Sequence, residues 1–232
     1  MSEDKKTLID LVPDSIDNAV KNITDKPTQN IGTTFADIWY LVFGGISQAA
    51  EKRKIKYSYA LQEFENELKE KISKIPKDKL VEPDTQIVAK ALEESKYCID
   101  KEQLRKMFSN LISKSLDSTT QQNVHPIFIN IISQLNSSDA KLMEKIYKID
   151  EGSSIKLDIE DEYKFLISLS VLEHNGLIQS DIHEKLMTAS WGNSNIETLT
   201  SFIKTSEGHS TNIKVTELGK LFCKICINDD WQ

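Results

Sequence analysis

Apolar residues recur at helical spacing along most of the chain. A short stripe covers residues 8–23 and ends at Thr24-Asp25-Lys26-Pro27. A longer stripe advances by three or four residues from 46 to 75, the spacing that places side chains on one face of a helix. It predicts one long helix that stops before Pro76, with Gly44-Gly45 as the place for a bend. The stripe consists of Ile46, Ala50, Arg53, Tyr57, Leu61, Phe64, Leu68, Ile72 and Ile75.

Three more helices are predicted before residue 136. One covers residues 85–97, between a proline-bracketed loop and the next start signal. The second begins at Asp100, which can cap a helix, with Gln103 three residues later as in a capping box. The third follows His125-Pro126, because proline suits the first turn of a helix. Its residues 127–135 are almost wholly apolar, so we expect them to be buried.

The pattern changes after residue 136. Helices are predicted from Ser137-Ser138-Asp139, over 160–174 up to Asn175-Gly176, and after a Thr216 cap. Short strands are predicted at 155–157, 177–179 and 212–215, while 182–191 fits either a helix or a strand. This order is similar to a winged-helix module. The predicted fold class is therefore mainly α, with a long-helix helical body followed by a C-terminal winged-helix-like α+β module. The predicted domains are an N-terminal helix and linker (1–29), a helical domain (30–135) and an acidic winged-helix-like domain (136–232).

The charge of the last predicted domain affects which partners it can bind. The chain of 232 residues is 39% hydrophobic, enough for a packed core, and carries a net charge of −7. Residues 136–232 contain 10 Lys, no Arg and 16 Asp or Glu, so they carry −6 and leave −1 for the first 135 residues. Because Lys and Arg supply most non-specific affinity for nucleic acids, DNA binding by this domain is disfavoured. Three cysteines are too few for a secreted disulfide framework, so we expect a cytoplasmic protein.

The most apolar segment, residues 33–50, has two interpretations. Its uninterrupted apolar core covers 38–46, about half of the ~20 residues that a membrane span needs. A buried helix explains this pattern. Contact with a membrane stays open because Trp39-Tyr40 is a pair of the type favoured at lipid interfaces. Trp39 and Tyr40 are therefore candidate interaction positions.

No pattern for catalysis or for a cofactor stands out. Cys223 and Cys226 form a CxxC that lies mid-helix or later and lacks a second ligand pair, so two small buried residues explain it better than zinc or redox chemistry. The acidic run at 158–162 suits a helix start. His125 is the best placed of the four histidines; a capping role and a functional site both remain open for it. We expect no cofactor, no metal and no enzymatic activity.

The central stretch resembles the bacterial abortive infection alpha family. The resemblance is carried by "LEESKYCIDKEQLRKMFSNLISKSLD" and by "NVHPIFINIISQLNSSDAKLM", over residues 30–225. The family pattern has a helix with an LR pair, an HP-x-F turn and a QL-S-x-x-DA stretch. The matching positions are Leu104-Arg105, Phe108, Leu111-Ile112, Ser115-Leu116-Asp117, His125-Pro126, Phe128, Gln134-Leu135 and Asp139-Ala140.

The resemblance implies a role in bacterial defence against phage, without a known reaction or catalytic residues. Arg105, His125 and Asp139 are the matched polar positions and hence candidate functional positions, with ion-paired or capping roles as the alternative. We predict a non-enzymatic defence protein that acts through a protein partner or through self-assembly. A winged-helix regulator that binds nucleic acid and a membrane effector that uses residues 33–50 are the alternatives.

Overall fold

The computed structural model describes residues 35, 37–39, 41–43, 51–150, 162–180 and 213–228. It divides into two compact units, which we call the helical unit (Met1–Gln134 with Ile225–Gln232) and the C-terminal unit (Leu135–Lys224). The described part is mainly helical with one small antiparallel sheet, in agreement with the predicted class at that level. The boundary between the units lies between Gln134 and Leu135, and residues 225–232 group with the helical unit.

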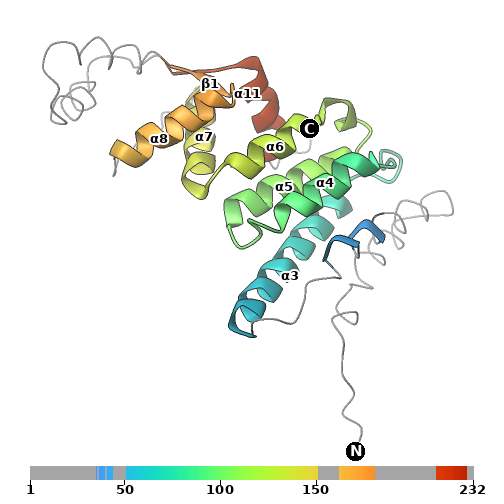
Figure 1. The fold of residues 1–232 in the computed structure, drawn as a ribbon. Helices are drawn as coiled ribbons and strands as arrows, with labels where there is room; N and C mark the ends of the chain where they lie inside the picture. The colour runs from blue at the N-terminus through green and yellow to red at the C-terminus, as the bar shows by residue number, and fades with distance from the viewer. Residues whose placement is uncertain are drawn as a thin grey trace, which may run out of the picture. The chain divides into compact units, whose positions relative to one another are not determined.

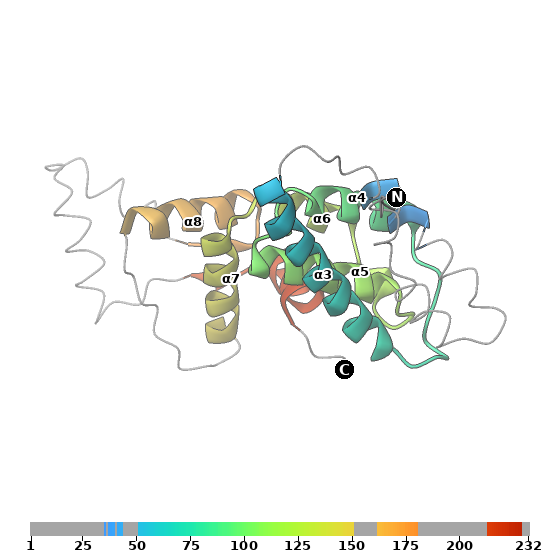
Figure 2. The ribbon, with the colours of Figure 1, turned by 90° about the horizontal axis from the view of Figure 1, so that it is seen from below.

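The helical unit is built around a central helix. Figure 1 shows its elements α3 (Glu51–Ser73), α4 (Thr85–Ser95), α5 (Glu102–Ser115) and α6 (Pro126–Gln134), and Figure 2 shows them from below. Helix α5 contacts α3, α4 and α6, and α4 also contacts α6. Side chains from all four helices are fully buried, and α5 contributes the most of them. The largest of them include Phe64, Leu68, Leu92, Phe108, Leu111 and Phe128.

The long apolar stripe explains the placement of α3. Its positions Phe64, Leu68 and Ile72 are buried, and α3 ends at Ser73, before Pro76, as predicted. Proline has no backbone N–H and a fixed φ, so it cannot continue a helix without breaking it. Residues 44–50, where a bend was predicted, and the first stripe at 8–23 lie outside the described residues.

The start of α5 differs from the prediction. The helix begins at Glu102, so Lys101 occupies the cap position and makes no side-chain capping bond. The prediction of Asp100 as the cap was therefore wrong by one residue. The reason is the turn after α4, in which the Lys101 N–H donates to the carbonyl of Cys98 at 2.8 Å. This turn keeps the chain coiled past Asp100, and the first bond of α5 runs from the Arg105 N–H to the Lys101 carbonyl.

The C-terminal unit combines helices with two short strands. Its elements are α7 (Ser137–Asp150), α8 (Glu162–His174), β1 (Ile178–Gln179), β2 (Lys214–Val215) and α11 (Glu217–Phe222). The strands pair antiparallel, with Ile178 opposite Val215, and α7 contacts both α8 and β2. A π-helical turn, η4 (Cys223–Ile227), follows α11. The predicted strand at 155–157 and the ambiguous stretch 182–191 lie outside the described residues.

The turn after α8 adopts the left-handed exit that its Asn-Gly pair predicts. Gly176 has a φ of 69°, a conformation that glycine adopts without steric cost. The Gly176 N–H donates to the Glu173 carbonyl at 2.8 Å, and the Leu177 N–H donates to the Leu172 carbonyl at 3.0 Å. These two bonds form a Schellman motif, which satisfies carbonyls at the end of a helix. The turn directs the chain into β1.

The Thr-x-x-Gly segment locks α11 onto that turn. The Thr216 hydroxyl accepts a bond from the Gly219 N–H at 2.9 Å, which is the predicted cap, and donates to the Gly176 carbonyl at 2.6 Å. A Cβ on Gly219 would lie 2.0 Å from the Leu177 carbonyl oxygen. Only glycine therefore lets α11 approach the backbone of the turn this closely.

Candidate functional site

Arg105, the first candidate position, is held in an ion pair inside the helical unit. It lies on α5, and its Nε and Nη2 atoms both approach Oε1 of Glu67 on α3, at 3.0 and 2.9 Å. The Arg105 and Glu67 side chains are only 10% and 16% exposed. Arg105 Nη1 also donates to the Ile99 carbonyl at 3.4 Å. This guanidinium joins α3, α5 and the turn before α5, so its geometry is that of a structural tie.

One oxygen of this pair has no bond. Glu67 Oε2 is buried and lacks a hydrogen-bond partner, although a buried polar atom without a partner costs about 1–3 kcal/mol. Both Arg105 nitrogens engage the other oxygen. The pair is therefore incompletely satisfied, which makes the net stabilisation smaller than the two short contacts suggest.

His125 caps the helix that follows it. Its Nδ1 accepts a bond from the backbone N–H of Ile127 at 3.1 Å, and its side chain is exposed. Pro126 takes the first position of α6, where the missing N–H is not needed. The imidazole thus replaces the Ser, Thr or Asp that usually accepts from the first turn. This is one of the two roles that the sequence left open for His125.

Asp139 closes a reciprocal cap at the start of α7. Its Oδ2 accepts from the Asn136 N–H at 2.8 Å, while Asn136 Oδ1 accepts from the N–H groups of Ser138 and Asp139, at 2.6 and 3.1 Å. Asp139 is 1% exposed, and its other oxygen, Oδ1, is buried without a partner. The arrangement is a capping box with Asn and Asp in place of the usual Ser and Glu.

Trp39 is buried in an aromatic cluster of the helical unit. Its ring lies 4.6 Å from that of Phe43 and 5.8 Å from that of Phe64 on α3, measured between centroids. Trp39 is 3% exposed, and Phe35 also stacks on it. The indole therefore anchors the described part of 33–50 to α3, as the buried interpretation predicts. Tyr40 lies outside the described residues.

Leu41 is the exception in this apolar segment. It is 80% exposed, whereas Ile38 and Val42 are buried. Among the described residues, no helix has the length and the apolar character that crossing a membrane requires.

The cysteines are buried thiols. Burial raises the pKa of Cys98 to about 11, and it also raises the pKa of Cys226, against the opposing effect of Lys114. Since the thiolate is the form that attacks and binds metals, both thiols are held in their unreactive form at neutral pH. The described residues contain no group of three or more His, Cys, Asp or Glu side chains placed to hold a metal ion.

Sequence reasoning missed two buried polar residues on α5. Asn110 and Lys114 lie one helical turn apart and are only 2% and 3% exposed. Asn110 Nδ2 donates to the carbonyls of Cys226 and Ile227, at 3.0 and 3.4 Å, and Lys114 Nζ donates to the carbonyl of Asn228 at 2.7 Å. Only five of the 14 residues of α5 are apolar, so two polar residues in it are no signal by themselves, and the groups that they bind lie more than 110 residues away in the sequence.

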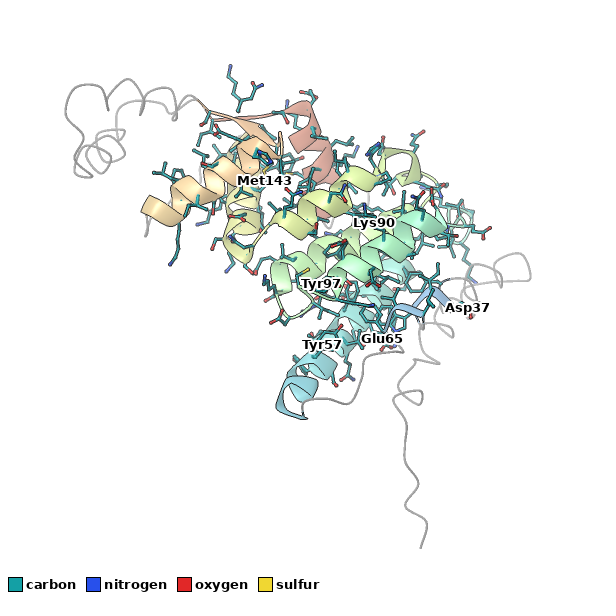
Figure 3. The ribbon with its side chains drawn as sticks, viewed as in Figure 1. Asp37, Tyr57, Glu65, Lys90, Tyr97 and Met143 are labelled. Atoms are coloured by element: carbon teal, nitrogen blue, oxygen red, sulfur yellow. The ribbon has the colours of Figure 1, made fainter. Side chains whose placement is uncertain are left out.

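Two exposed aromatic residues were also missed as candidates. Tyr59 on α3 is 65% exposed, and Tyr97, in the turn after α4, is 76% exposed. Figure 3 labels Tyr97 together with Lys90 of α4, whose Nζ donates to Asn130 Oδ1 of α6 at 2.7 Å. By contrast Tyr57 is half-buried, and burial, with the nearby Glu93 carboxylate, raises its pKa to about 12.

The candidate positions do not form one site. Arg105, His125 and Trp39 belong to the helical unit, and each bonds or stacks with different partners. Asp139 belongs to the C-terminal unit. Each of the three matched polar side chains makes a bond that organises a helix or a helix pair. A functional role for any of them stays a prediction.

Comparison with known proteins gives one clear result. The family model described as abortive infection alpha matches residues 56–226. No curated protein and no solved structure gives a significant match. The matched region begins within α3 and includes the rest of α3, α4 to α6 and the described elements of the C-terminal unit as far as Cys226, which is most of the chain. The protein therefore belongs to the abortive infection alpha family.

Proposed function

We propose that this protein is a non-enzymatic defence protein of the abortive-infection type, which limits phage through a protein partner or through self-assembly. The family description supports the defence role. In such a role, the protein must recognise something that changes during infection. A surface on the helical unit supplies this recognition.

The proposal of a non-enzymatic role rests on the bonds that the three matched polar side chains make within the fold. Arg105 is committed to Glu67, and the His125 and Asp139 side chains accept bonds from helix starts. General acid–base catalysis needs a group that is within reach of a substrate proton. Groups that hold helices in place are poorly suited to this task. These three positions therefore maintain the fold that presents a binding surface.

The exposed tyrosines supply the surface. Tyrosine is enriched at protein interfaces because its ring buries a large apolar area while its hydroxyl finds a hydrogen bond. Tyr97 and Tyr59 are the described aromatic residues with the greatest exposure. We expect one or both to act as binding hot spots, where truncation costs about 2 kcal/mol or more of binding energy.

We further propose that the C-terminal unit is a winged-helix module used as an acidic adaptor. The helix-turn-strand order of α8 and β1, the antiparallel β1–β2 pair and the closing helix α11 support this assignment. The charge of residues 136–232, which lack arginine, favours a basic protein partner over the phosphates of DNA. An experimental structure of residues 151–212 tests the assignment: a third strand paired with this sheet supports it, and an all-helical segment contradicts it.

The defence role is tested in bacteria that express the full chain and are infected with phage. We expect wild-type protein to protect, and Tyr97→Ser or Tyr59→Ser to lose protection at unchanged thermal stability. Ile167→Ser is the matched control, because Ile167 on α8 is also a large exposed apolar residue, at 60% exposure. Light scattering and affinity capture from infected cells then identify the assembly.

Three outcomes contradict the proposal. Full protection by both tyrosine variants would show that the tyrosines do not form the binding surface. A strict monomer that captures no protein would show that the protein acts neither through a partner nor through self-assembly. Micromolar binding to duplex DNA that weakens steeply with salt favours a nucleic-acid regulator instead. Flotation of the intact protein with liposomes favours a membrane effector.

A further inference from the structure

The only Asn-Gly pair in the sequence, Asn175-Gly176, forms the turn between α8 and β1. In such a pair the backbone nitrogen of the glycine can attack the side-chain carbonyl carbon of the asparagine, because glycine has no side chain to hinder the approach. A bond forms between Gly176 N and Asn175 Cγ, the Cγ–Nδ2 bond breaks, and ammonia leaves. Water then opens the cyclic imide to aspartate or isoaspartate. The chemistry of the pair is that of spontaneous deamidation.

Both groups that must react are hydrogen-bonded in the folded turn. The Gly176 N–H, which has to lose its proton for the attack, donates to the Glu173 carbonyl at 2.8 Å. The Asn175 amide, which has to turn its carbon toward that nitrogen, donates through Nδ2 to the Val171 carbonyl at 2.9 Å. Ring closure would break both bonds, and the first of them is part of the Schellman motif that ends α8.

Thr216 holds the glycine from its other side. Its hydroxyl donates to the Gly176 carbonyl at 2.6 Å and accepts from the Gly219 N–H at 2.9 Å, so the peptide after the attacking nitrogen is tied to the start of α11. The next N–H, that of Leu177, donates to the Leu172 carbonyl at 3.0 Å. These bonds fix the glycine at both of its peptide groups and oppose the rotation that would bring its nitrogen to Asn175 Cγ.

We propose that Asn175 is a latent deamidation site, at which the closed turn and its bonds to Thr216 suppress attack by the Gly176 nitrogen. Exclusion of water is not the cause, because Asn175 and Gly176 are both only half-buried. The bonds of the turn supply the protection instead. This inference does not depend on the proposed role in defence.

Either product of the reaction would fit the junction with α11 poorly. Aspartate places a negative charge at the C-terminal end of α8, where the helix dipole disfavours it. Isoaspartate routes the backbone through the side chain and so adds a methylene group to the turn. The space for a longer turn is small, because even a Cβ on Gly219 would lie 2.0 Å from the Leu177 oxygen. Suppression of the reaction therefore preserves the packing of α11 on the turn.

The rate of deamidation can be measured on the intact chain. The protein is incubated in mildly alkaline buffer and then digested with trypsin, which cleaves after Lys164 and Lys185 and leaves Asn175 as the only asparagine of that peptide. Fragmentation in the mass spectrometer separates Asn175 from Gln179. We expect the folded protein to react at least about tenfold more slowly than the same chain unfolded in urea, because the turn must open before the ring closes. Equal rates would overturn the proposal.

Three variants separate the bonds of Thr216 from general stability. Thr216→Val removes the hydroxyl and keeps a branched side chain, so deamidation of the folded protein should become about tenfold faster. Thr216→Ser keeps the hydroxyl and should change the rate by less than about twofold. Met143→Ala is the control, because it removes a fully buried side chain of α7 and none of the bonds of the turn. An unchanged rate in Thr216→Val, or an equal acceleration in Met143→Ala, would also overturn the proposal.

Discussion

The packing of the two units depends on opposite features of their side chains. The helical unit depends on large side chains that fill its core: α5 is packed by three other helices, and the core contains large apolar residues such as Phe108. The C-terminal unit depends on a missing side chain at Gly219, where the backbone of α11 approaches Leu177. Loss of volume should therefore damage the first unit most, and gain of volume the second.

The sequence motifs of the two units differ in the same way. In the helical unit, half of the positions that match the family pattern are apolar residues of the core, and Arg105 joins two helices through its ion pair. In the C-terminal unit, the Asn-Gly turn and the Thr-x-x-Gly segment meet through backbone groups and one hydroxyl. Each motif thus reflects a requirement of the fold.

The largest expected effect comes from loss of volume in the helical unit. Phe108→Ala removes a fully buried ring of α5, and such truncations cost about 3–5 kcal/mol of unfolding free energy. Urea unfolding of the variant, followed by hydrogen exchange of α5 amides, measures the loss. Ile127→Ala is the control, since Ile127 on α6 is 41% exposed. Equal losses in the two variants would show that volume in this core is not decisive.

The reverse change tests the C-terminal unit. In Gly219→Ala, the added methyl would lie 2.0 Å from the Leu177 oxygen and 2.9 Å from Val215 Cγ1, so α11 must shift. We expect a loss of about 3 kcal/mol, at the upper end of the range for overpacking, because a backbone atom is in the way. Hydrogen exchange should place the loss in β1, β2 and α11.

Gly176→Ala is the matched control for crowding. A Cβ there meets its nearest atom at 3.6 Å, so the only penalty is the positive φ, which costs about 1 kcal/mol for alanine. If Gly219→Ala is no more harmful than Gly176→Ala, the close approach of α11 does not limit this unit.

The ion pair of the helical unit should have a smaller effect. Arg105→Met leaves the Glu67 carboxylate without its partner in a largely buried position. We expect a loss of about 2 kcal/mol, below the 3–5 kcal/mol of fully buried pairs because both side chains retain some exposure. Denaturant unfolding of Arg105→Met, Glu67→Met and the double variant gives the coupling energy. A double variant as unstable as the sum of the two single losses would show that the pair has no coupling.

The helices were predictable because periodicity reports which side faces the core. The stripe through Phe64, Leu68 and Ile72 predicted α3, and the Asn-Gly pair predicted the end of α8. The start of α5 was missed by one residue because capping preference cannot show how far a preceding turn extends. The need for glycine at position 219 depends on a backbone 42 positions earlier, which no local pattern contains.

The site was predictable only in part. The resemblance selected Arg105, His125 and Asp139, but it could not show that Arg105 would meet a carboxylate 38 residues earlier. Asn110 and Lys114 were missed because the carbonyls that they bind are backbone groups, which every residue has. Sequence patterns report side-chain chemistry, so partners that are backbone atoms stay hidden until the chain is folded.

The smallest expected effect concerns His125, where the fold and a catalytic role make different predictions. His125→Ala removes the acceptor for the Ile127 N–H, and loss of a cap costs about 1 kcal/mol. His125→Asn supplies another acceptor and should recover most of that stability. Phage protection should survive both changes, because a cap acts only through the stability of α6. Thermal unfolding and infection assays on the same two variants measure this. Loss of protection in His125→Asn at wild-type stability would instead assign the imidazole a chemical role beyond that of a helix cap.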